Sequence, residues 1–480
     1  MRIAKYLAAA AVWAAIPAMS APAPADGLSA ERDKAAHDMF EHIINIPTVF
    51  GRGNVPSMAN YLADQYKAAG FPAEDVKVHP YESLDPVAKV TDKTAALIVR
   101  WRAPGKPKEK PILLMGHMDV VEAKREDWST DPFVMTEKDN YYYGRGSIDM
   151  KDGIVGITQA IFDLKAAGFK PTRDIVVLFT GDEETNGIGA NMGAKDWKSE
   201  MDVEYGLNAD GGGGGVFPDG RPPIFTLQTA EKTFAGYTLT VHNRGGHSSK
   251  PRKDNAIYSL AHALDKIEAH RFEPMLSETT RAYFTERQKQ ENGPLGDAMR
   301  AWLANPKDGA AADAIEADEA EVGLTRTRCV PTRLFGGHAD NALPQLATAM
   351  INCRIFPGVD PNDIQKELTA TVADPEVVVS RNDNYVASLS SPLRPDVTAA
   401  YTKAVHALHP GALIAPEMST GASDARPFRI AGIPIYGVDG AWRVIPVDFR
   451  AHGRDERLPV KALDANVVHW KILLKELAGK

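Results

Sequence analysis

The chain has 480 residues, of which 44% are hydrophobic and 25% are charged, and its formal net charge at pH 7 is −8. This length exceeds what one ordinary hydrophobic core organises, so we expect two or more packed units. The acidic balance gives no electrostatic reason to bind nucleic acid or an anionic membrane surface, and we expect neither as a partner.

The first residues have the three-part pattern of a secretory signal peptide. Arg2 and Lys5 precede an apolar run over residues 6–16, and the small-residue stretch Pro17–Ala25 follows. The run is too short to cross a bilayer, and no later stretch approaches the roughly 20 apolar residues that a membrane helix needs. An amphipathic first helix is the alternative, but the run carries no charge on any face. We therefore expect residues 1–23 to be a signal peptide and the mature protein to be periplasmic or secreted.

Residues 30–230 alternate helix-like and strand-like segments, which is typical of an α/β unit with a mostly parallel sheet. Gly70 and Gly168 end two of the predicted helices. The predicted helices cover 35–44, 58–69 and 154–167, and the predicted strands cover 95–101, 111–115 and 174–179. The run Gly211–Gly215 cannot pack a core and predicts a loop, and no Gly-Lys-Ser/Thr follows it to make a phosphate site.

Residues 231–385 follow a different order of elements. Strand 234–241, helix 256–269, strands 329–334 and 348–356, helix 361–371 and strand 376–380 succeed one another along this stretch. The order β-α-β-β-α-β predicts an inserted ferredoxin-like α+β lid domain. The charged stretch 275–322 lies within it and is expected to be helical. Residues 386–480 return to α/β character, so the first unit is interrupted and then resumed.

Cys329 and Cys353 are the only cysteines. They lie about equally far on either side of a turn over 336–341, so a hairpin lets them face each other, and an exported chain permits a disulfide. Two unpaired, buried thiols are an equally good interpretation. Their number and spacing do not favour a thiolate metal site.

Acidic residues and a histidine follow three separate apolar or glycine-rich stretches. His117 and Asp119 follow the first, Asp149 the second, and Glu183 and Glu184 the third. Ligands at the ends of parallel strands converge on the crevice outside the sheet. A two-metal site needs a bridging carboxylate, further ligands on each metal and a free carboxylate that carries a proton. The layout therefore predicts a two-metal hydrolase.

Five motifs together resemble the co-catalytic dizinc aminoacylase and carboxypeptidase family, which includes glutamate carboxypeptidase, carnosine dipeptidase and succinyl-diaminopimelate desuccinylase. They are His117-Met-Asp119, Gly144-Arg-Gly-Ser-Ile-Asp149, Asp182-Glu-Glu184, Asn208-Ala-Asp210 and His452-Gly-Arg. The motifs occur in the family's order, and the resemblance extends from about residue 35 to 475. It implies an α/β zinc-peptidase domain and an inserted lid through which family members often form homodimers.

The resemblance also implies the metal ligands. His117, Asp149 and Asp210 would form one set, and Asp149, Glu184 and His452 the other, so that Asp149 bridges two zinc ions. Cobalt or manganese suit the same imidazole and carboxylate ligands. Many relatives carry Asp-Asp where this chain has Asp149-Met150, but the bridging position is intact. The nearby histidines at 406 and 409 are competitors for the role of His452.

Three further roles follow from the resemblance. Asp119 would hydrogen-bond the second ring nitrogen of His117 and fix its tautomer. Glu183 would take a proton from the attacking water and deliver it to the leaving amine. His247, in the segment Gly245-Gly-His247-Ser-Ser, would donate to the substrate oxyanion. The alternative for His247 is a hydrogen-bonded turn histidine.

The resemblance places the substrate's terminal carboxylate on Asn341 and Arg354. The guanidinium of Arg354 fits two carboxylate oxygens, and the alternative is a surface arginine paired with an acid. The loop Thr420–Asp424, together with Arg426, resembles a family loop that lines the pocket. The resemblance assigns no firm role to these residues.

These features lead us to expect an exported dizinc carboxypeptidase or dipeptidase that cleaves the amide bond next to a free C-terminal carboxylate. An aminoacylase acting on N-acyl amino acids would use the same machinery. A non-catalytic periplasmic binding protein is the alternative from another class, but it has no need of Glu183 beside the ligand Glu184. A structural zinc protein is disfavoured, because such sites prefer closed, cysteine-rich coordination.

Overall fold

The computed structural model describes residues 30–85, 89–382 and 387–479. The predicted signal peptide, residues 1–23, lies outside these ranges. Within them, no helix has the length and apolar character that a membrane span requires.

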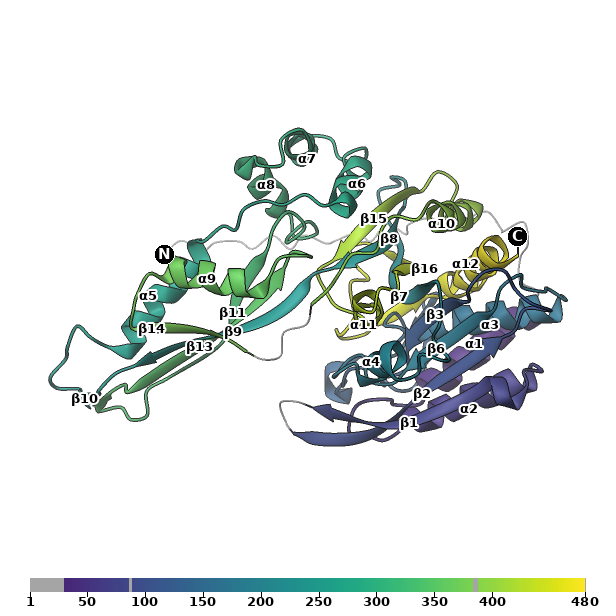
Figure 1. Ribbon diagram of the computed structural model, residues 1–480, viewed down its shortest axis with the longest axis horizontal. Helices are drawn as coiled ribbons and strands as arrows, with labels where there is room; N and C mark the ends of the chain where they lie inside the picture. The colour runs from purple at the N-terminus through teal and green to yellow at the C-terminus, as the bar shows by residue number, and fades with distance from the viewer. Residues whose placement is uncertain (1–29, 86–88, 383–386, 480) are drawn as a thin grey trace, which may run out of the picture.

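A mixed sheet of eight strands forms the centre of the larger unit (Figure 1). Its strands are β1 (Val76–Asp85), β2 (Val90–Trp101), β3 (Ile112–His117), β6 (Ile175–Thr180), β7 (Tyr205–Val216), β8 (Ile224–Glu231), β15 (Leu413–Ser419) and β16 (Ile435–Val444). They are arranged in the order β1-β2-β6-β3-β7-β16-β8-β15. The pairs β6–β3, β3–β7, β7–β16 and β8–β15 are parallel. The predicted α/β class with a mostly parallel sheet is confirmed.

Helices cover both faces of this sheet because successive strand side chains point to opposite sides. Leu97 and Val99 pack under the first set of helices, whereas Ala96 and Ile98 pack under the second. The first set comprises α1 (Ala30–Ile44), α2 (Val55–Ala68), α3 (Lys151–Ala166), α10 (Pro395–Leu408) and α12 (Val460–Ala478). The second comprises α4 (Ile188–Lys195) and α11 (Ala425–Ile430).

The glycine run that we expected to form a loop lies in β7, so that prediction is wrong. In this stretch β7 pairs with β16 in parallel and with β8 in antiparallel orientation. A Cβ atom added at Gly212 would lie 2.8 Å from the carbonyl oxygens of both Gly437 and Thr226, and its φ of +83° favours glycine. Glycine is therefore required here, because a larger residue would prevent the three strands from lying so close together.

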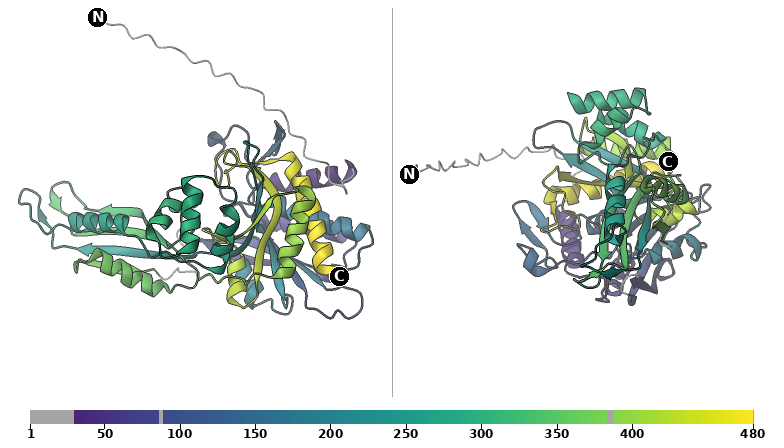
Figure 2. Two further views of the ribbon diagram at one scale, coloured as in Figure 1. Left: turned by 90° about the horizontal axis from the view of Figure 1, so that it is seen from above. Right: turned by 90° about the vertical axis from the view of Figure 1, so that its left-hand side faces the viewer.

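A second unit projects from the central sheet (Figures 1 and 2). Its elements are β9 (Thr233–His242), α5 (Ala256–Ala269), β11 (Arg328–Gly336), β13 (Leu346–Ile355), α9 (Pro361–Val372) and β14 (Val377–Arg381). They follow the predicted β-α-β-β-α-β order, and the antiparallel strands are arranged β11-β13-β9-β14. Apolar side chains of both helices share one core with the sheet. We refer to residues 233–381 as the second unit.

The cysteines form a disulfide across two strands of the second unit. Cys329 in β11 is paired in register with Cys353 in β13, and the two sulfur atoms are bonded. Of the two interpretations of these residues, the disulfide is therefore the one that the structure shows.

The charged stretch 275–322 is helical, as predicted. It contains α6 (Glu278–Arg287), α7 (Pro294–Ala304) and α8 (Gly309–Glu316). Phe284, Met299 and Trp302 form a small core with Met418 of β15 and Phe356. The three helices thus pack against residues of both units.

Candidate metal centre

The five predicted ligands converge at one edge of the central sheet. His117 is the last residue of β3, Asp149 directly precedes the turn into α3, and Glu184 follows β6. Asp210 lies in β7, and His452 lies in the loop between β16 and the short strand β17 (Arg457–Pro459). The carboxyl ends of the parallel strands β3 and β6 and the residues of β7 meet here, which explains why segments so distant in the chain share one site.

Asp149 lies between the two histidines. His117 Nε2 is 3.2 Å from Asp149 Oδ1, and His452 Nε2 is 3.1 Å from Asp149 Oδ2. His452 Nε2 is also 3.0 Å from Glu184 Oε1, and His117 Nε2 is 4.0 Å from Asp210 Oδ1. Each oxygen of Asp149 thus faces one of the two predicted ligand sets, as a bridging carboxylate requires.

The donor chemistry of the site fits a metal ion. One ligand atom from each of His117, Asp149 and Glu184 lies within 4.8 Å of the other two. His117 Nε2 is buried and makes no hydrogen bond with the part of the chain that the structure describes. Buried polar atoms ordinarily have a partner, so an unpartnered imidazole nitrogen among carboxylates is suited to coordinate a cation.

The site holds more acid than its histidines neutralise. Burial raises the pKa of Glu183 well above its usual range, and the nearby charge of Asp210 raises it further. Burial and the charge of Asp149 likewise raise the pKa of Asp210. Hydrogen bonds with Asp149 and Glu184 raise the pKa of His452 to about 10. Crowded carboxyl groups that resist ionisation are stabilised by a bound cation, which removes their mutual repulsion.

Asp119 contacts His117 differently from our expectation. The backbone carbonyl of Asp119 lies 3.0 Å from His117 Nδ1, whereas its carboxylate oxygen Oδ1 is 3.6 Å away. The carboxylate accepts hydrogen bonds from the backbone N–H groups of Glu183, at 3.1 Å, and Glu184, at 3.0 Å. An Nδ1–H donated to the carbonyl leaves Nε2 free as a ligand. Asp119 therefore orients the histidine and also clamps the Glu183–Glu184 turn.

An ion pair that the sequence analysis missed joins two of the ligand segments. Arg145 Nη1 contacts Glu456 Oε2, and Arg145 Nη2 donates to the carbonyl of Gly453 at 3.1 Å. Glu456 also accepts a hydrogen bond from the N–H of Ile148 at 2.8 Å. The pair supports His452, whose φ of +60° is uncommon for a non-glycine residue and persists only where its surroundings fix it. Arg145 lies in the Gly144–Asp149 motif, and Glu456 comes shortly after His452. Their opposite charges and their positions in two ligand motifs are the sequence features that could have predicted the ion pair.

The competing histidines take no part in the site. His406 Nε2 lies 2.9 Å from the carbonyl of Ala412, and His409 packs against the ring of Phe225. Burial lowers the pKa of His409 to about 4. Of the three histidines, His452 is therefore the one whose ring faces Asp149 and Glu184.

His247 and Asn341 lie far from this centre in the same chain. His247 belongs to the short strand β10 (Gly246–His247), which pairs with β12 (Ala342–Leu343). Figure 1 shows β10 at the far end of the second unit from β3 and β6. His247 is exposed, and its Nδ1 lies 2.8 Å from Ser249 Oγ, as in the alternative of a hydrogen-bonded turn histidine. Within one chain the structure separates these two residues from the five ligands.

Arg354 lies at the opposite end of the second unit. It is close to the C-terminal end of β13, and its guanidinium lies over the ring of Phe234, 5.3 Å from the centroid. Burial lowers the pKa of Arg354, and the neighbouring charge of Arg426 lowers it further. Arg426, at the start of α11, donates from Nε to the carbonyl of Ser423 at 3.3 Å. The charge of Arg426 thus acts on Arg354 across the two units, and a carboxylate bound between the two guanidinium groups would relieve their repulsion.

The comparisons with known proteins agree with this geometry. Residues 113–476 match the model of peptidase family M20/M25/M40. The chain belongs to this peptidase family. This M20 peptidase is 30% identical over 417 residues to probable carboxypeptidase S-like 2 of Dictyostelium discoideum, which covers 83% of this chain and 76% of the relative.

Two further similarities concern substrate and fold. The human N-fatty-acyl-amino acid synthase/hydrolase PM20D1 is 29% identical over 374 residues, which cover 75% of this M20 peptidase and 73% of the relative. The crystal structure of the M20 family metallo-carboxypeptidase Sso-CP2 from Sulfolobus solfataricus superimposes with a TM-score of 0.67 at 16% identity, covering 92% of this chain and 98% of that one. The predicted family resemblance is confirmed, and this M20 peptidase is a hydrolase.

Proposed function

We propose that this M20 peptidase is a dizinc carboxypeptidase or dipeptidase that cleaves the amide bond next to a free C-terminal carboxylate in short peptides. The observation that carries the proposal is that each oxygen of Asp149 faces a different histidine. His117, Asp149 and Asp210 would hold one zinc ion, and Asp149, Glu184 and His452 the other. When bound, the metal pair supplies the Lewis acidity that polarises the amide carbonyl.

Glu183 is the acid–base group in this proposal. It belongs to neither ligand set, and the carboxylate of Asp119 holds its backbone N–H in place. Its carboxyl group is close enough to the predicted ligand Asp210 to be affected by its charge, so it is placed to exchange a proton at the metal centre. Glu183 would accept a proton from the attacking water and pass it to the nitrogen of the leaving amine. A protein that only binds its ligand would not need this group.

The terminal carboxylate of the substrate would bind between Arg354 and Arg426. The charge of Arg426, which lowers the pKa of the half-buried Arg354 across the two units, supports this assignment. A guanidinium presents a fork of donors that matches two carboxylate oxygens. An N-acyl amino acid carries the same carboxylate, so an aminoacylase is the second candidate, favoured by the similarity to the N-fatty-acyl-amino acid hydrolase.

A homodimer through the second unit would complete the site. β11 is an edge strand, and Val330, Leu334 and Phe335 on it are 53%, 64% and 52% exposed. An exposed apolar edge strand is suited to pair with another chain. In such a dimer, His247 and Asn341 at the tip of one chain would reach the metal centre of the other. This arrangement would give both residues the roles that their motifs predict.

Export to the periplasm or beyond is also part of the proposal. The pattern of residues 1–23 supports it. The disulfide between Cys329 and Cys353 supports it independently, because disulfides persist in oxidising compartments. Detection of the mature N-terminus in the periplasmic or extracellular fraction would test it.

The variant Glu183→Gln tests the catalytic proposal. The change removes the proton carrier but no ligand, so we expect kcat to fall by about 10²- to 10⁴-fold while two metal ions per chain are retained. Turnover of short peptides and metal content by elemental analysis are measured on the same samples. Glu126→Gln, at an exposed position, is the matched control.

Chelation and metal addition complete the test. Activity should disappear with the metal and return with zinc, and peptides with an amidated C-terminus should be poor substrates. Full activity of Glu183→Gln would overturn the role of this residue. Activity that survives complete metal removal would overturn the two-metal proposal.

A further inference from the structure

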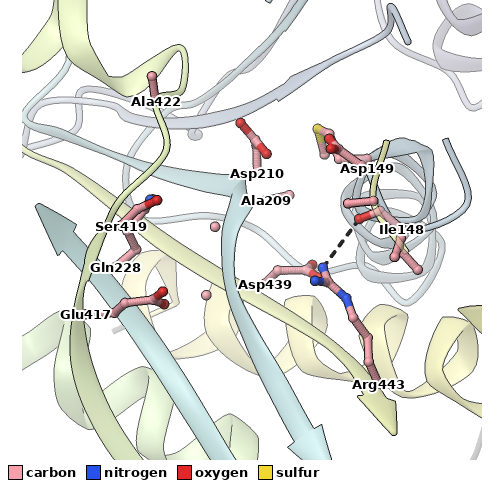
Figure 3. A pocket seen from close by; sticks show the side chains of 14 residues that line it. Ile148, Asp149, Ala209, Asp210, Gln228, Glu417, Ser419, Ala422, Asp439 and Arg443 are labelled. Atoms are coloured by element: carbon pink, nitrogen blue, oxygen red, sulfur yellow. Dashed lines mark hydrogen bonds between the residues drawn. The ribbon is translucent and has the colours of Figure 1, made fainter. Parts of the chain in front are cut away.

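A polar cavity of about 190 Å³ opens beside the metal centre (Figure 3). Asp149 and Asp210 form part of its wall, so a substituent of an amide held at the metal centre would enter it. The other polar side chains of the wall are Gln228, Glu417, Ser419, Asp439 and Arg443. None of these five residues belongs to the proposed metal sets or to the acid–base group.

Besides Asp149 and Asp210, the wall has two acidic side chains and one basic side chain. Arg443 is the one basic side chain in it, and its Nη2 donates to the carbonyl of Ile148 at 3.3 Å. Glu417 and Asp439 both line the cavity, and burial raises the pKa of each carboxyl group although Arg443 opposes the shift. Figure 3 shows Glu417 on one side of the cavity and Asp439 with Arg443 on the other. A cation entering between them would relieve the unfavourable burial of two acids beside one base.

Gln228, which lines the cavity, has a side-chain oxygen that accepts no hydrogen bond from the described residues. Its side chain is 5% exposed, and its Oε1 atom has no hydrogen-bond partner within the described ranges of the chain. The atom is held close to two backbone segments, since a Cβ added at Gly211 would lie 2.3 Å from it and one at Gly437 2.8 Å. Buried carbonyl oxygens ordinarily accept a hydrogen bond. A ligand with N–H groups would supply the missing donor.

The charge of the wall decides which side of the amide the cavity takes, and this step rests on the proposed function. The terminal carboxylate is expected between Arg354 and Arg426. The same carboxylate would be repelled by a cavity lined with Glu417 and Asp439. The group on the acyl side of the scissile amide is therefore the one that enters the cavity.

The volume of the cavity limits the length of this group. A cavity of roughly 150 Å³ accommodates benzene, and pockets for drug-sized ligands measure about 300 to 1,000 Å³. The cavity here, at about 190 Å³, lies near the lower of these values. It has room for one short residue. A fatty acyl chain, the group named in the human relative, would exceed this volume and bring no polar partner for the acids of the wall.

We propose that this cavity is the acyl-side specificity pocket of the enzyme and that it selects a short residue bearing a positively charged amino group. The ammonium group would donate to the carboxylate of Glu417 and to Gln228 Oε1. Asp439, which accepts a hydrogen bond from the N–H of Ala441 at 3.2 Å, would contribute its charge from the opposite wall. The preferred substrates are then short dipeptides and aminoacyl amino acids.

Three substrates test the proposal on the mature, zinc-loaded enzyme. N-(4-aminobutyryl)-leucine and N-pentanoyl-leucine have the same number of heavy atoms and differ in the charge at the end of the acyl chain. N-dodecanoyl-leucine tests the limit of length. We expect kcat/KM to be at least about tenfold higher for the aminobutyryl than for the pentanoyl substrate, because a charge-assisted hydrogen bond is one of the stronger contacts. The dodecanoyl substrate should be the poorest of the three.

Two variants locate the preference in the cavity. Glu417→Gln keeps the shape but removes a charge, and Gln228→Met removes the unpartnered oxygen, so each should bring the ratio of the two kcat/KM values closer to one. Glu319→Gln, at an exposed position outside the cavity, should keep the parental ratio. Thermal unfolding identifies any variant that does not fold. In that case the other cavity variant shows whether the preference for the amino group depends on the cavity.

The outcomes separate this inference from the proposed function. If neither these amides nor short peptides are hydrolysed, the proposed function fails and this inference fails with it. If short peptides are cleaved and none of the three amides is, only the inference fails. If they are hydrolysed without preference for the amino group, or with the dodecanoyl substrate preferred, only the specificity pocket is overturned. A ratio that is unchanged in both folded cavity variants would also overturn it. A higher ratio for the aminobutyryl substrate that falls in Glu417→Gln would support it.

Discussion

At the metal centre, the side chain of His117 is 1% exposed and its ring is surrounded by Asp119, Asp149 and Asp210. At the tip of the second unit, His247 is exposed, and its Nδ1 lies 2.8 Å from Oγ of the neighbouring Ser249 and accepts a hydrogen bond from the backbone N–H of Ser249 at 3.1 Å. Both histidines come from motifs of the same family. The first is held by the sheet of its own chain, whereas the second belongs to β10, at the end of the second unit far from that sheet (Figure 1).

In the proposed homodimer, one catalytic site would therefore depend on two kinds of organisation. Asp149 and Glu184 are fixed by strands and a helix that pack in one core. His247 lies in the two-stranded sheet β10–β12, and Asn341 directly precedes β12. In the proposed homodimer, the position of both residues relative to a metal centre would depend on how the chains assemble. Loss of a residue in the first region should therefore act within each chain, and loss of one in the second should act across chains.

The largest effect is expected for Asp149→Asn. The amide keeps the volume of the side chain but gives up the charge that faces both His117 and His452. We expect metal content to fall and kcat/KM to drop at least about a thousandfold, because bound metal contributes several kcal/mol to such reactions. Elemental analysis and peptide hydrolysis measure the two effects.

Asp202→Asn is the matched control for this change, since Asp202 is exposed and pairs with Lys110 on the surface. It should keep the metal and the activity of the parent protein. Retention of both metals and of full turnover in Asp149→Asn would show that this residue does not bridge them.

A smaller effect is expected for His247→Ala. Removal of one oxyanion donor commonly lowers kcat by about 10²- to 10³-fold, and the metal content should not change because His247 lies outside the ligand set. Co-expression with Glu183→Gln then separates the two modes of organisation. In a dimer with shared sites, mixed pairs have one intact site, so about a quarter of the parental activity should return.

Size-exclusion chromatography shows whether the co-expressed chains are dimers. Dimers that recover no activity would mean that each chain supplies its own His247. A His247→Ala variant with parental kcat would favour the alternative of a hydrogen-bonded turn histidine.

The same contrast explains what the sequence could predict. His117, Asp149 and Glu184 follow elements whose periodicity is visible in the chain, so their convergence followed from the rule for parallel sheets. The order of strands and helices in the second unit was equally predictable from the sequence. The strand at Gly211–Gly215 was not predictable, because these glycines allow close contacts with two strands at once, and one of them, β16, lies far away in the sequence.

Contacts between distant segments also account for the other omissions. The pair Arg145–Glu456 joins two motifs that are more than 300 residues apart. The cavity beside Asp149 is formed by Glu417 and Asp439 from β15 and β16, which carry no recognisable motif. From the sequence, Asp119 was paired with the second ring nitrogen of His117, and only the structure shows that the backbone carbonyl is closer to it than the carboxylate.

The smallest expected effect concerns the disulfide, which lies in the second unit away from the ligands. Replacing Cys329 and Cys353 by alanine opens a link between residues 24 positions apart. Such a link stabilises a fold by about 3 kcal/mol, mainly by restricting the unfolded chain. We expect the second unit to unfold at a lower temperature while zinc content stays at the parental value, because no ligand is held by β11 or β13.

Calorimetry with and without a reductant distinguishes this outcome from general damage. The reductant should shift the parental protein towards the behaviour of the double variant and should leave the variant itself unchanged. If hydrolysis is completed by His247 from a neighbouring chain, activity should decline near the temperature at which the second unit unfolds, before the metal is released. Loss of zinc and of the second unit in one transition would instead show that the two regions are stabilised together, and the contrast between them would not hold.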